Sequence, residues 1–510
     1  MKGKFLLSSV FMFVFYASNA QSDEVIDSYN KGVVYDRSGH YKEAIAAFTL
    51  TINLDANYAN AYYARGNAKS NSEDQKGAIL DYDKAISLNT VNSDFYCNRG
   101  IAKSSLEDYK NAIIDFNKAI ELNPDDAAPY YLRGNAKCNL GACLIAIADY
   151  DKAIAIGPAR AGYYAGRANA EEHIEAYGKA ITDYSKAIEI DPKDDYYYYA
   201  RAVTEATLQH FQSAVTDLNK AIQISPEDAD YYDERGSAKY NSDNFYGAIA
   251  DYSKAIEIDP KNADYYTDRG DAKCDSGDYA GAIADYNSAI AIDPKNGYYY
   301  DSRGYAKADN EDYSGAISDY NKAIDIDPKN AEYYADRGDA KFDLENYTAA
   351  IADYSKAISI DPKNADYYEN RGAAKFGKAD YKGAIADYAN AIAVDPKNAK
   401  YYNDRGNAKS ALGNNREAIT DYNIAIKIDS ADAEYYNSRG MAKISVADSK
   451  GALTDMDKAI QLEPDNSMFY SNRGAIKLSL KQKKSGCLDL NKALELGDKD
   501  VAAEIKENCK

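Results

Sequence analysis

Six cysteines and three histidines are the residues of this chain best suited to redox or metal chemistry. Thiolates and imidazoles are the ligands that zinc prefers, and cysteines in exported proteins also form disulfides. The histidines share no metal-ligand spacing, and the cysteine spacings match no zinc motif. We therefore expect no metal site and no cofactor. The nine residues are Cys97, Cys138, Cys143, Cys274, Cys487, Cys509, His40, His173 and His210.

Two pairs of cysteines are suited to disulfide formation. A bridge between Cys138 and Cys143 would be local, and one between Cys487 and Cys509 would fasten the C-terminus. Six cysteines are few for 510 residues, so disulfides are not expected to be the main source of stability. Six free thiols are the alternative, and the spacing does not decide between the two.

Carboxylates are abundant, with 81 Asp and Glu residues, and carboxylates serve as general acids and bases. Here they recur at regular intervals, and repetition explains them better than catalysis does. No Ser or Cys nucleophile has a base with a local signature, and no Gly-rich phosphate loop follows a predicted strand. We therefore expect that the chain is not an enzyme.

The elements that position these residues repeat every 34 residues. The segment IDPKNADYY stands at residues 258–266 and again at 360–368, three periods later. Arg-Gly dipeptides recur in the same register. Fourteen units of 34 residues run without insertion from Val25 to Asp500.

Each unit is predicted to form two helices joined by turns. In residues 263–296, Ala282, Tyr286 and Ala289 share one face of a second helix, which Pro294 ends. Gly270 is expected to face Ala282 and Ala289, where two helices must approach closely. The last position of most units is Asn or Asp, as at Asn262, and is expected to cap the next first helix.

Arginine at position 7 of the unit recurs with aspartate at position 23, as at Arg269 and Asp285. The first unit lacks both and has Lys31 and Ala47 instead. Because both members are lost together, we predict that each pair forms inside one unit. The result would be a ladder of Arg–Asp contacts between the two helices of each repeat.

The pattern resembles the tetratricopeptide repeat family, whose 34-residue unit reads W-x2-L-G-x2-Y, then A-x3-F, then A and P. The resemblance covers residues 25–500, with Tyr, Arg and Lys in place of the family's Trp, Leu and Tyr. It implies an all-α fold, a right-handed superhelical α-solenoid of helix-turn-helix repeats. The matching residues of one unit are Tyr266, Arg269, Gly270, Lys273, Ala282, Tyr286, Ala289 and Pro294.

The resemblance also implies that first helices line a concave groove, mainly at unit positions 2, 5, 9, 12 and 13. In the early units these positions hold tyrosines and small or amide residues, such as Tyr63, Tyr131 and Tyr199. In the middle units they are acidic, which predicts a partner-binding groove for basic segments, or a charged face that only keeps the protein soluble. The acidic residues are Asp230, Asp233, Asp264, Asp271, Asp275, Asp301, Asp309, Glu332, Asp339, Asp343, Asp366 and Glu369.

The two ends of the chain differ from the repeats. Residues 1–20 combine Lys2 and Lys4, an apolar run and a small-residue cleavage site, which is typical of a secretory signal peptide. The run is shorter than the ~18–20 apolar residues of a spanning helix, so we expect no transmembrane segment after cleavage. Residues 21–24 are a lead-in. Residues 501–510 are predicted to form a C-terminal capping helix, with Asp500 as its cap and one apolar side that includes Val501 and Ala502.

These features predict a non-enzymatic scaffold that binds protein or peptide partners, basic ones among them, outside the cytoplasm. We expect the bacterial periplasm, the outer-membrane periphery or secretion. The net charge of −20 argues against a nucleic-acid partner. The alternatives are a glycan-binding envelope protein and a structural spacer or assembly element without a groove ligand. The sequence does not indicate an oligomeric state.

Overall fold

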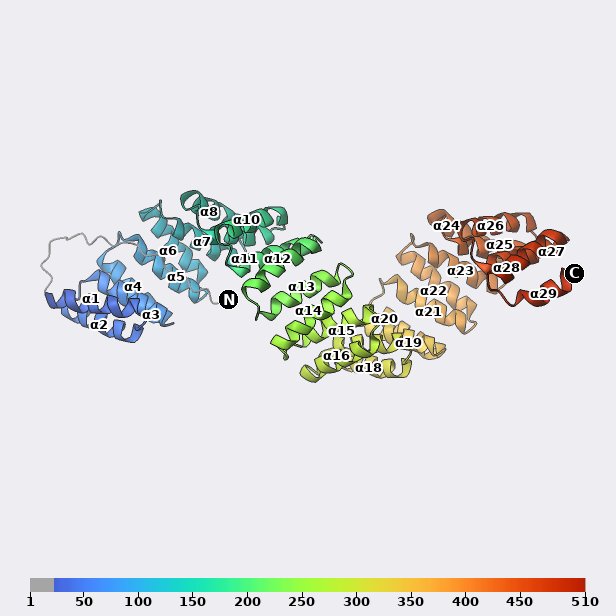
Figure 1. Cartoon of the computed structure of the whole chain (residues 1–510), viewed down its shortest axis with the longest axis horizontal. Coiled ribbons are helices and arrows are strands. Elements are labelled where there is room, and N and C mark those ends of the chain that lie inside the picture. The colour runs from blue at the N-terminus through green and yellow to red at the C-terminus, as the bar shows by residue number, and fades with distance from the viewer. Residues whose placement is uncertain (1–22, 510) are drawn as a thin grey trace. The chain divides into compact units, whose positions relative to one another are not determined.

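The computed structural model describes residues 23–509, which fold entirely into helices and their connections (Figure 1). The predicted signal peptide lies outside these residues, as does Lys510. The described residues form two compact units, divided between Ser242 and Asp243. Each unit is a superhelical solenoid of stacked helix hairpins, as the repeat pattern predicts. None of the described helices has the length and apolar content that crossing a bilayer requires.

The first unit contains the helices up to the division at Ser242. They are α1 (Asp23–Arg37), α2 (Tyr41–Leu54), α3 (Ala59–Asn71), α4 (Gln75–Leu88), α5 (Ser93–Ser105), α6 (Tyr109–Leu122), α7 (Ala127–Asn139), α8 (Cys143–Ile156), α9 (Ala161–Glu172), α10 (Tyr177–Ile190), α11 (Asp195–Thr207), α12 (Phe211–Ile224) and α13 (Ala229–Tyr240).

The second unit contains the remaining helices. They are α14 (Phe245–Ile258), α15 (Ala263–Asp275), α16 (Tyr279–Ile292), α17 (Gly297–Asp309), α18 (Tyr313–Ile326), α19 (Ala331–Asp343), α20 (Tyr347–Ile360), α21 (Ala365–Gly377), α22 (Tyr381–Val394), α23 (Ala399–Ala411), α24 (Asn415–Ile428), α25 (Ala433–Ser445), α26 (Ser449–Leu462), α27 (Ser467–Ser479), α28 (Lys483–Glu495) and α29 (Val501–Asn508).

The hairpin of α15 and α16 shows why the sequence folds in this way. Asn262 accepts a hydrogen bond from the backbone N–H of Asp264 (3.0 Å), which confirms the predicted cap of the first helix. The turn contains Gly277 with φ of +84°, a left-handed conformation that glycine adopts without strain. Ala282 and Tyr286 of α16 are buried, and the helix ends at Ile292, just before the proline.

Gly270 is close to a different side chain from the one we expected. A Cβ atom added there would lie 2.7 Å from Cε1 of Tyr286, and the other nearest atoms belong to the same ring. The prediction that Gly270 faces Ala282 and Ala289 did not name this ring, and whether the two alanines also lie against Gly270 stays a prediction. The absence of a side chain at Gly270 leaves room for the aromatic ring that reaches across from the second helix.

The C-terminal helix α29 is held by packing and by a disulfide. Val501 is buried and belongs to a cluster with Leu490, Ala493 and Ile505, while Ala502 is exposed, contrary to the predicted apolar side. Asp500 precedes the helix, but its side chain makes no capping hydrogen bond. Its backbone is already helical (φ −71°, ψ −25°), whereas a capping residue normally has extended angles.

Both predicted disulfides are present. Cys138 is bonded to Cys143, and Cys487 is bonded to Cys509. The remaining two cysteines, Cys97 and Cys274, are buried free thiols. The alternative of six free thiols is therefore wrong. The second disulfide joins α28 to the residue that follows α29 and so fastens the end of the described chain.

Candidate functional site

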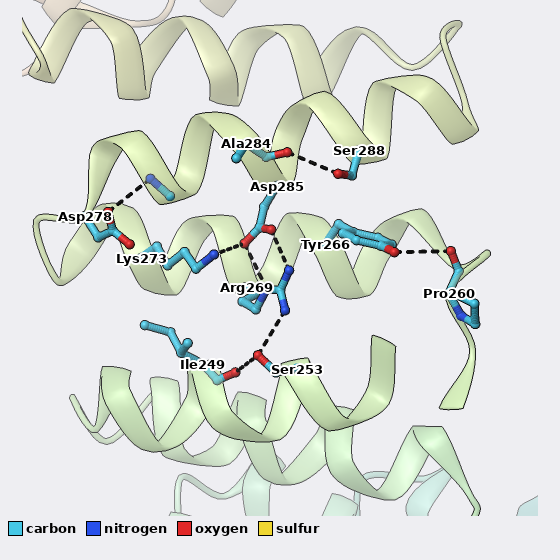
Figure 2. Close-up of polar contacts among 11 residues, drawn as sticks. Ile249, Ser253, Pro260, Tyr266, Arg269, Lys273, Asp278, Ala284, Asp285 and Ser288 are labelled. Carbon is cyan, nitrogen blue, oxygen red and sulfur yellow. Dashed lines mark hydrogen bonds and ion pairs between the residues drawn. The ribbon is translucent and has the colours of Figure 1, made fainter. Parts of the chain in front are cut away.

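A triad of charged side chains joins the two helices of most repeats, and Figure 2 shows it for α15 and α16. The first repeat lacks the Arg–Asp pair, and the repeats of Arg167 and Arg201 have Glu171 and Glu205 in place of the lysine. Asp285 of α16 is 4% exposed and accepts hydrogen bonds from Nε and Nη2 of Arg269 at 2.9 and 2.6 Å. Nζ of Lys273 lies 2.7 Å from Oδ2 of Asp285, the oxygen that also accepts from Nε of Arg269. This bidentate geometry is among the strongest that a carboxylate makes in proteins. It confirms the predicted Arg–Asp pair inside one repeat.

The same arginine also contacts the preceding repeat. Nη1 of Arg269 donates to the hydroxyl of Ser253 on α14 at 3.0 Å (Figure 2). The guanidinium carbon lies 5.8 Å from the ring centroid of Tyr266, close enough for a cation–π contact. Arg269 therefore joins three helices, α14, α15 and α16. Neither the lysine nor the bond between repeats was predicted from the sequence.

Equivalent contacts recur along the chain with small changes. Arg337 is bonded to Asp353 in its own repeat and to Asn321 in the preceding one. Arg405 is bonded to Asp421, but the residue equivalent to Ser253 in the preceding repeat is Ala389, which offers no side-chain acceptor. Because the triad is copied from repeat to repeat, its role is to hold the scaffold together and not to perform chemistry.

The predicted acidic residues all lie on first helices. Asp230 and Asp233 belong to α13 in the first unit, and the other ten belong to α15, α17, α19 and α21 in the second. Asp275, Asp309 and Asp343 are each the last residue of a helix. The exposed members of the set are Asp230, Asp264, Asp275, Asp309, Glu332, Asp339, Asp343 and Asp366; Asp233, Asp271 and Asp301 are half-buried, and Glu369 is buried.

Several of these carboxylates are held in place by tyrosine hydroxyl groups. Tyr401 donates to Asp366 at 2.6 Å, from the first helix of the next repeat. Tyr354 donates to Asp339 at 2.6 Å, from the second helix of the same repeat. Asp264 and Asp271 accept from Tyr299 (3.0 Å) and Tyr286 (2.6 Å) in the same two ways. These hydrogen bonds fix the positions of the four carboxylates and so also orient the carboxylate oxygens that do not accept from a tyrosine.

Two carboxyl groups, Asp301 and Asp336, interact between α17 and α19. Burial, together with the neighbouring negative charge, raises the pKa of both groups. Oδ1 of Asp301 is buried and has no hydrogen-bond partner. Glu332, on the same helix as Asp336, adds a further negative charge to both. Asp336 was not among the predicted residues.

A second carboxyl pair lies between α21 and α23. Glu369 accepts a hydrogen bond from Asp404, and burial, followed by the charge of Glu369, raises the pKa of Asp404 to about 7. Nζ of Lys400 lies 3.2 Å from Oε1 of Glu369 and offsets part of the negative charge. Burial also raises the pKa of Asp339, to about 6. Asp404 too was absent from the predicted set.

Asp336 and Asp404 were missed because both stand at position 6 of the repeat, which is not among the predicted groove positions 2, 5, 9, 12 and 13. Asp301 and Asp336 are 35 residues apart, as are Glu369 and Asp404, so position 5 of one repeat meets position 6 of the next. The same offset joins Asn437 to Asn472 at 2.9 Å. A separation of 35 residues, one more than the repeat length of 34, therefore marks side chains that meet between adjacent repeats, and this separation could have been read from the sequence.

We call seven carboxylates the acidic surface, since contacts or electrostatic interactions connect them from α17 to α23. Adjacent first helices are in contact along this stretch. The seven residues are Asp301, Glu332, Asp336, Asp339, Asp366, Glu369 and Asp404.

The tyrosines of the early repeats have a different environment. Their rings pack against an aromatic ring of the next first helix: Tyr63 against Phe95 with centroids 4.8 Å apart, and Tyr131 against Tyr163 at 5.1 Å. Tyr199 packs against Tyr231 in the same way, at 5.1 Å. These ring faces are used between repeats, so they are less available for stacking on a ligand.

Comparison with protein-family models identifies the repeats. Models described as "Tetratricopeptide repeat" and "TPR repeat" match well over half of the chain between them. The first description matches residues 28–58, 59–92, 93–126, 161–194 and 196–228, and the second matches residues 236–273, 270–310, 304–344, 338–379 and 406–443.

The chain belongs to the tetratricopeptide repeat family. Among solved structures, this tetratricopeptide repeat protein is similar to the Cut9–Hcn1 hetero-tetramer of the APC/C, at 15% identity over 89% of this chain and 96% of that one, with a TM-score of 0.39. Yeast Tom70 is 18% identical over 86% of this chain and 92% of its own, with a TM-score of 0.39. No curated protein matches the chain at a significant level.

A third similar structure is a tetratricopeptide repeat protein from Parabacteroides merdae. It is 21% identical over 50% of this chain and 97% of its own length, with a TM-score of 0.39. The family assignment confirms the resemblance found in the sequence and supports a protein-interaction scaffold of stacked helix pairs.

Proposed function

We propose that the chain is a non-enzymatic scaffold of the cell envelope that binds basic peptide or protein segments on the acidic surface of α17–α23. The observation that carries this proposal is the grouping of carboxylates on adjacent first helices, where Lys400 already lies 3.2 Å from Glu369 and tyrosine hydroxyls hold Asp366 and Asp339 in place. Carboxyl groups that lie close together are stabilised when a Lys or Arg side chain approaches. Tetratricopeptide repeats, as protein-interaction scaffolds, are compatible with such a partner.

The local charge supports a cationic partner over a neutral one. The acidic surface contains seven carboxyl groups and one ion-paired cation, Lys400, and although the raised pKa values of Asp301, Asp336 and Asp404 reduce its charge, it stays negative. The hydrogen bonds from Tyr401 and Tyr354 keep Asp366 and Asp339 oriented before any partner arrives. Preorganised groups of this kind cost less to order on binding, so more of the electrostatic attraction contributes to affinity.

A lysine-rich peptide and a matched glutamate-rich peptide, each with a fluorescent label, would test the proposal with the full mature chain. We expect binding of the lysine-rich peptide only, weakening by at least several-fold between low and high salt because exposed charges are screened. The triple variant Asp301→Asn, Glu332→Gln, Asp336→Asn should lose most of this binding. Equal binding by the variant would refute the acidic surface as the site.

The control is a variant with the same loss of charge elsewhere. Glu189, Glu257 and Glu495 are exposed members of ion pairs on second helices, with exposed side-chain fractions of 65, 66 and 69%. Replacing all three with Gln should leave peptide binding almost unchanged. If this control weakens binding as much as the triple variant does, net charge and not the acidic surface attracts the peptide.

Two alternatives make different predictions in the same experiment. A glycan-binding protein would bind oligosaccharides with little dependence on salt, and a spacer without a groove ligand would bind neither probe. Export rests on the N-terminal sequence alone. Mass spectrometry of the protein purified from its native cell envelope should give a chain that starts at Gln21, and an intact Met1 would contradict export.

A further inference from the structure

Two cysteines and a histidine from two neighbouring repeats converge in the first unit. Cys138 lies near the end of α7, Cys143 begins α8, and His173 directly follows α9. The two sulfur atoms and one ring nitrogen of His173 all lie within 4.8 Å of one another. In the structure the two cysteines form a disulfide. The spacings in the sequence did not predict this grouping.

One nitrogen of the histidine ring is already hydrogen-bonded, as in many metal sites. Nδ1 of His173 lies 2.8 Å from the backbone carbonyl oxygen of Asn169. A carbonyl oxygen only accepts hydrogen bonds, so Nδ1 carries the proton and the lone pair is on Nε2. Histidine ligands of zinc usually donate their other ring N–H to a carbonyl or carboxylate, which fixes the tautomer and the orientation of the ring.

The convergence is a property of the repeat and does not depend on the disulfide. Positions 12 and 13 of adjacent repeats, 35 residues apart, are close elsewhere too, since the charge of Asp309 acts on Cys274. Cys138 and His173 stand at the same two positions. Position 12 also meets position 17 across the turn of a repeat, as in the hydrogen bond from Ser70 to Gln75 at 2.9 Å. The three side chains should therefore stay close after the disulfide is reduced.

Burial leaves the group shielded on one side and open on the other. Cys143 is buried, Cys138 is half-buried and His173 is exposed. An ion can thus approach from the side of the imidazole without opening the helices, which meets the need of a metal site for an entry path.

We propose that reduction of the Cys138–Cys143 disulfide creates a zinc site whose ligands are the two thiolates and the imidazole of His173. A dithiol reductant supplies two electrons and two protons, breaks the sulfur–sulfur bond and becomes a disulfide itself. Zn²⁺ then displaces one proton from each thiol and forms two Zn–S bonds and one Zn–N bond. The fourth position of the tetrahedron is left to water.

The remaining cysteines offer no comparable site. Cys97 and Cys274 are buried, and burial raises the pKa of both thiols, that of Cys274 to about 12, which disfavours the thiolate that zinc requires. Cys487 and Cys509 line a pocket that also contains the ammonium-bearing residues Lys483 and Lys484, whose charge repels a cation. Zinc binding after reduction is therefore expected at one place, with one ion per chain.

The test uses the full mature chain, prepared oxidised or reduced by a dithiol that is then removed without oxygen. Titration with Zn²⁺ is followed by calorimetry, and titration with Co²⁺ by the thiolate-to-metal charge-transfer band. We expect one tight site in the reduced protein and none in the oxidised protein. Tight binding by the oxidised protein, or no binding by the reduced protein, would overturn the proposal.

Variants identify the ligands. Loss of a residue that only hydrogen-bonds to a metal ligand typically weakens metal binding about 10–100-fold. His173→Ala removes a ligand itself and should weaken Zn²⁺ binding more than that, and the double variant Cys138→Ser with Cys143→Ser should abolish binding. Two matched controls, His210→Ala and Cys487→Ser with Cys509→Ser, should bind as the parent does. Unchanged affinity in His173→Ala overturns the site. His173 is exposed, so this variant decides the question even if the double cysteine variant loses helix content.

Discussion

Replacing Asp285 with Ala tests how strongly the charged triad holds a repeat together. The substitution removes a 4% exposed carboxylate and leaves Arg269 and Lys273 without their common partner. Removal of one member of a buried ion pair typically costs about 3–5 kcal/mol, because an uncompensated charge stays buried. Both cationic side chains are 18% exposed, so water can reach them, and we expect the lower end, about 3 kcal/mol.

The local consequence is measurable because repeats open individually. Hydrogen exchange followed by mass spectrometry reports the opening of α15 and α16 separately from the remaining helices. A loss of about 3 kcal/mol corresponds to more than roughly a hundredfold increase in the open population of this hairpin. Peptides from the neighbouring α14 and α17 should change less, and those from α1–α4 should not change.

The control is Glu257→Ala, which removes an exposed ion pair with Lys254 on α14. Such pairs contribute about 0–1 kcal/mol, so exchange should increase only slightly. If Asp285→Ala behaves like this control, the triad is effectively solvated and its burial contributes nothing to stability. If all helices lose protection equally, the repeats do not open as separate units, and the local reasoning fails.

Gly270→Ala should destabilise the protein by about 1–3 kcal/mol in urea unfolding, because the added methyl group overlaps the ring of Tyr286. The control Gly178→Ala, whose methyl group meets no atom within 4 Å, should not destabilise the protein. Equal effects of the two variants would contradict the packing argument. Because burial beside Glu369 raises the pKa of Asp404 to about 7 from its ordinary value of 3.8, the folded protein binds this proton more tightly than the unfolded chain does. The melting temperature should therefore rise as the pH falls from about 8 to about 5, with a smaller rise in Asp404→Asn, and an unchanged rise would refute this assignment. Cys509→Ser should increase hydrogen exchange in α29 but not in α25, and unaltered exchange would show that the packing of Val501 suffices.

The fold was predictable because the hydrophobic period and the capping residues agree in most repeats. Asn262, Pro294 and the buried Ala282 each determine one boundary or one face, and the structure confirms all three. The Arg–Asp pair was predictable because both members are lost together in the first repeat. Local chemistry of this kind can be recognised from one sequence.

Other features depend on side chains that meet across repeats. Lys273 completes the triad at a position where the family has a Tyr, so the family pattern gave no reason to place a cation there. Gly270 faces an aromatic ring because a long side chain reaches further than the helix positions suggest. Asp336 and His173 have their partners, Asp301 and Cys138, in the preceding repeat and 35 residues away, so the pattern within one repeat does not reveal them.

The bond that most arginines make to the preceding second helix has a consequence for folding. Ser253, Asn287 and Asn321 accept the same bond at successive steps, so a hairpin that docked one repeat out of place would find equivalent acceptors. Ala389 is an exception, since it offers Arg405 no side-chain acceptor. Refolding of the complete chain from denaturant should therefore produce misaligned species that slow recovery.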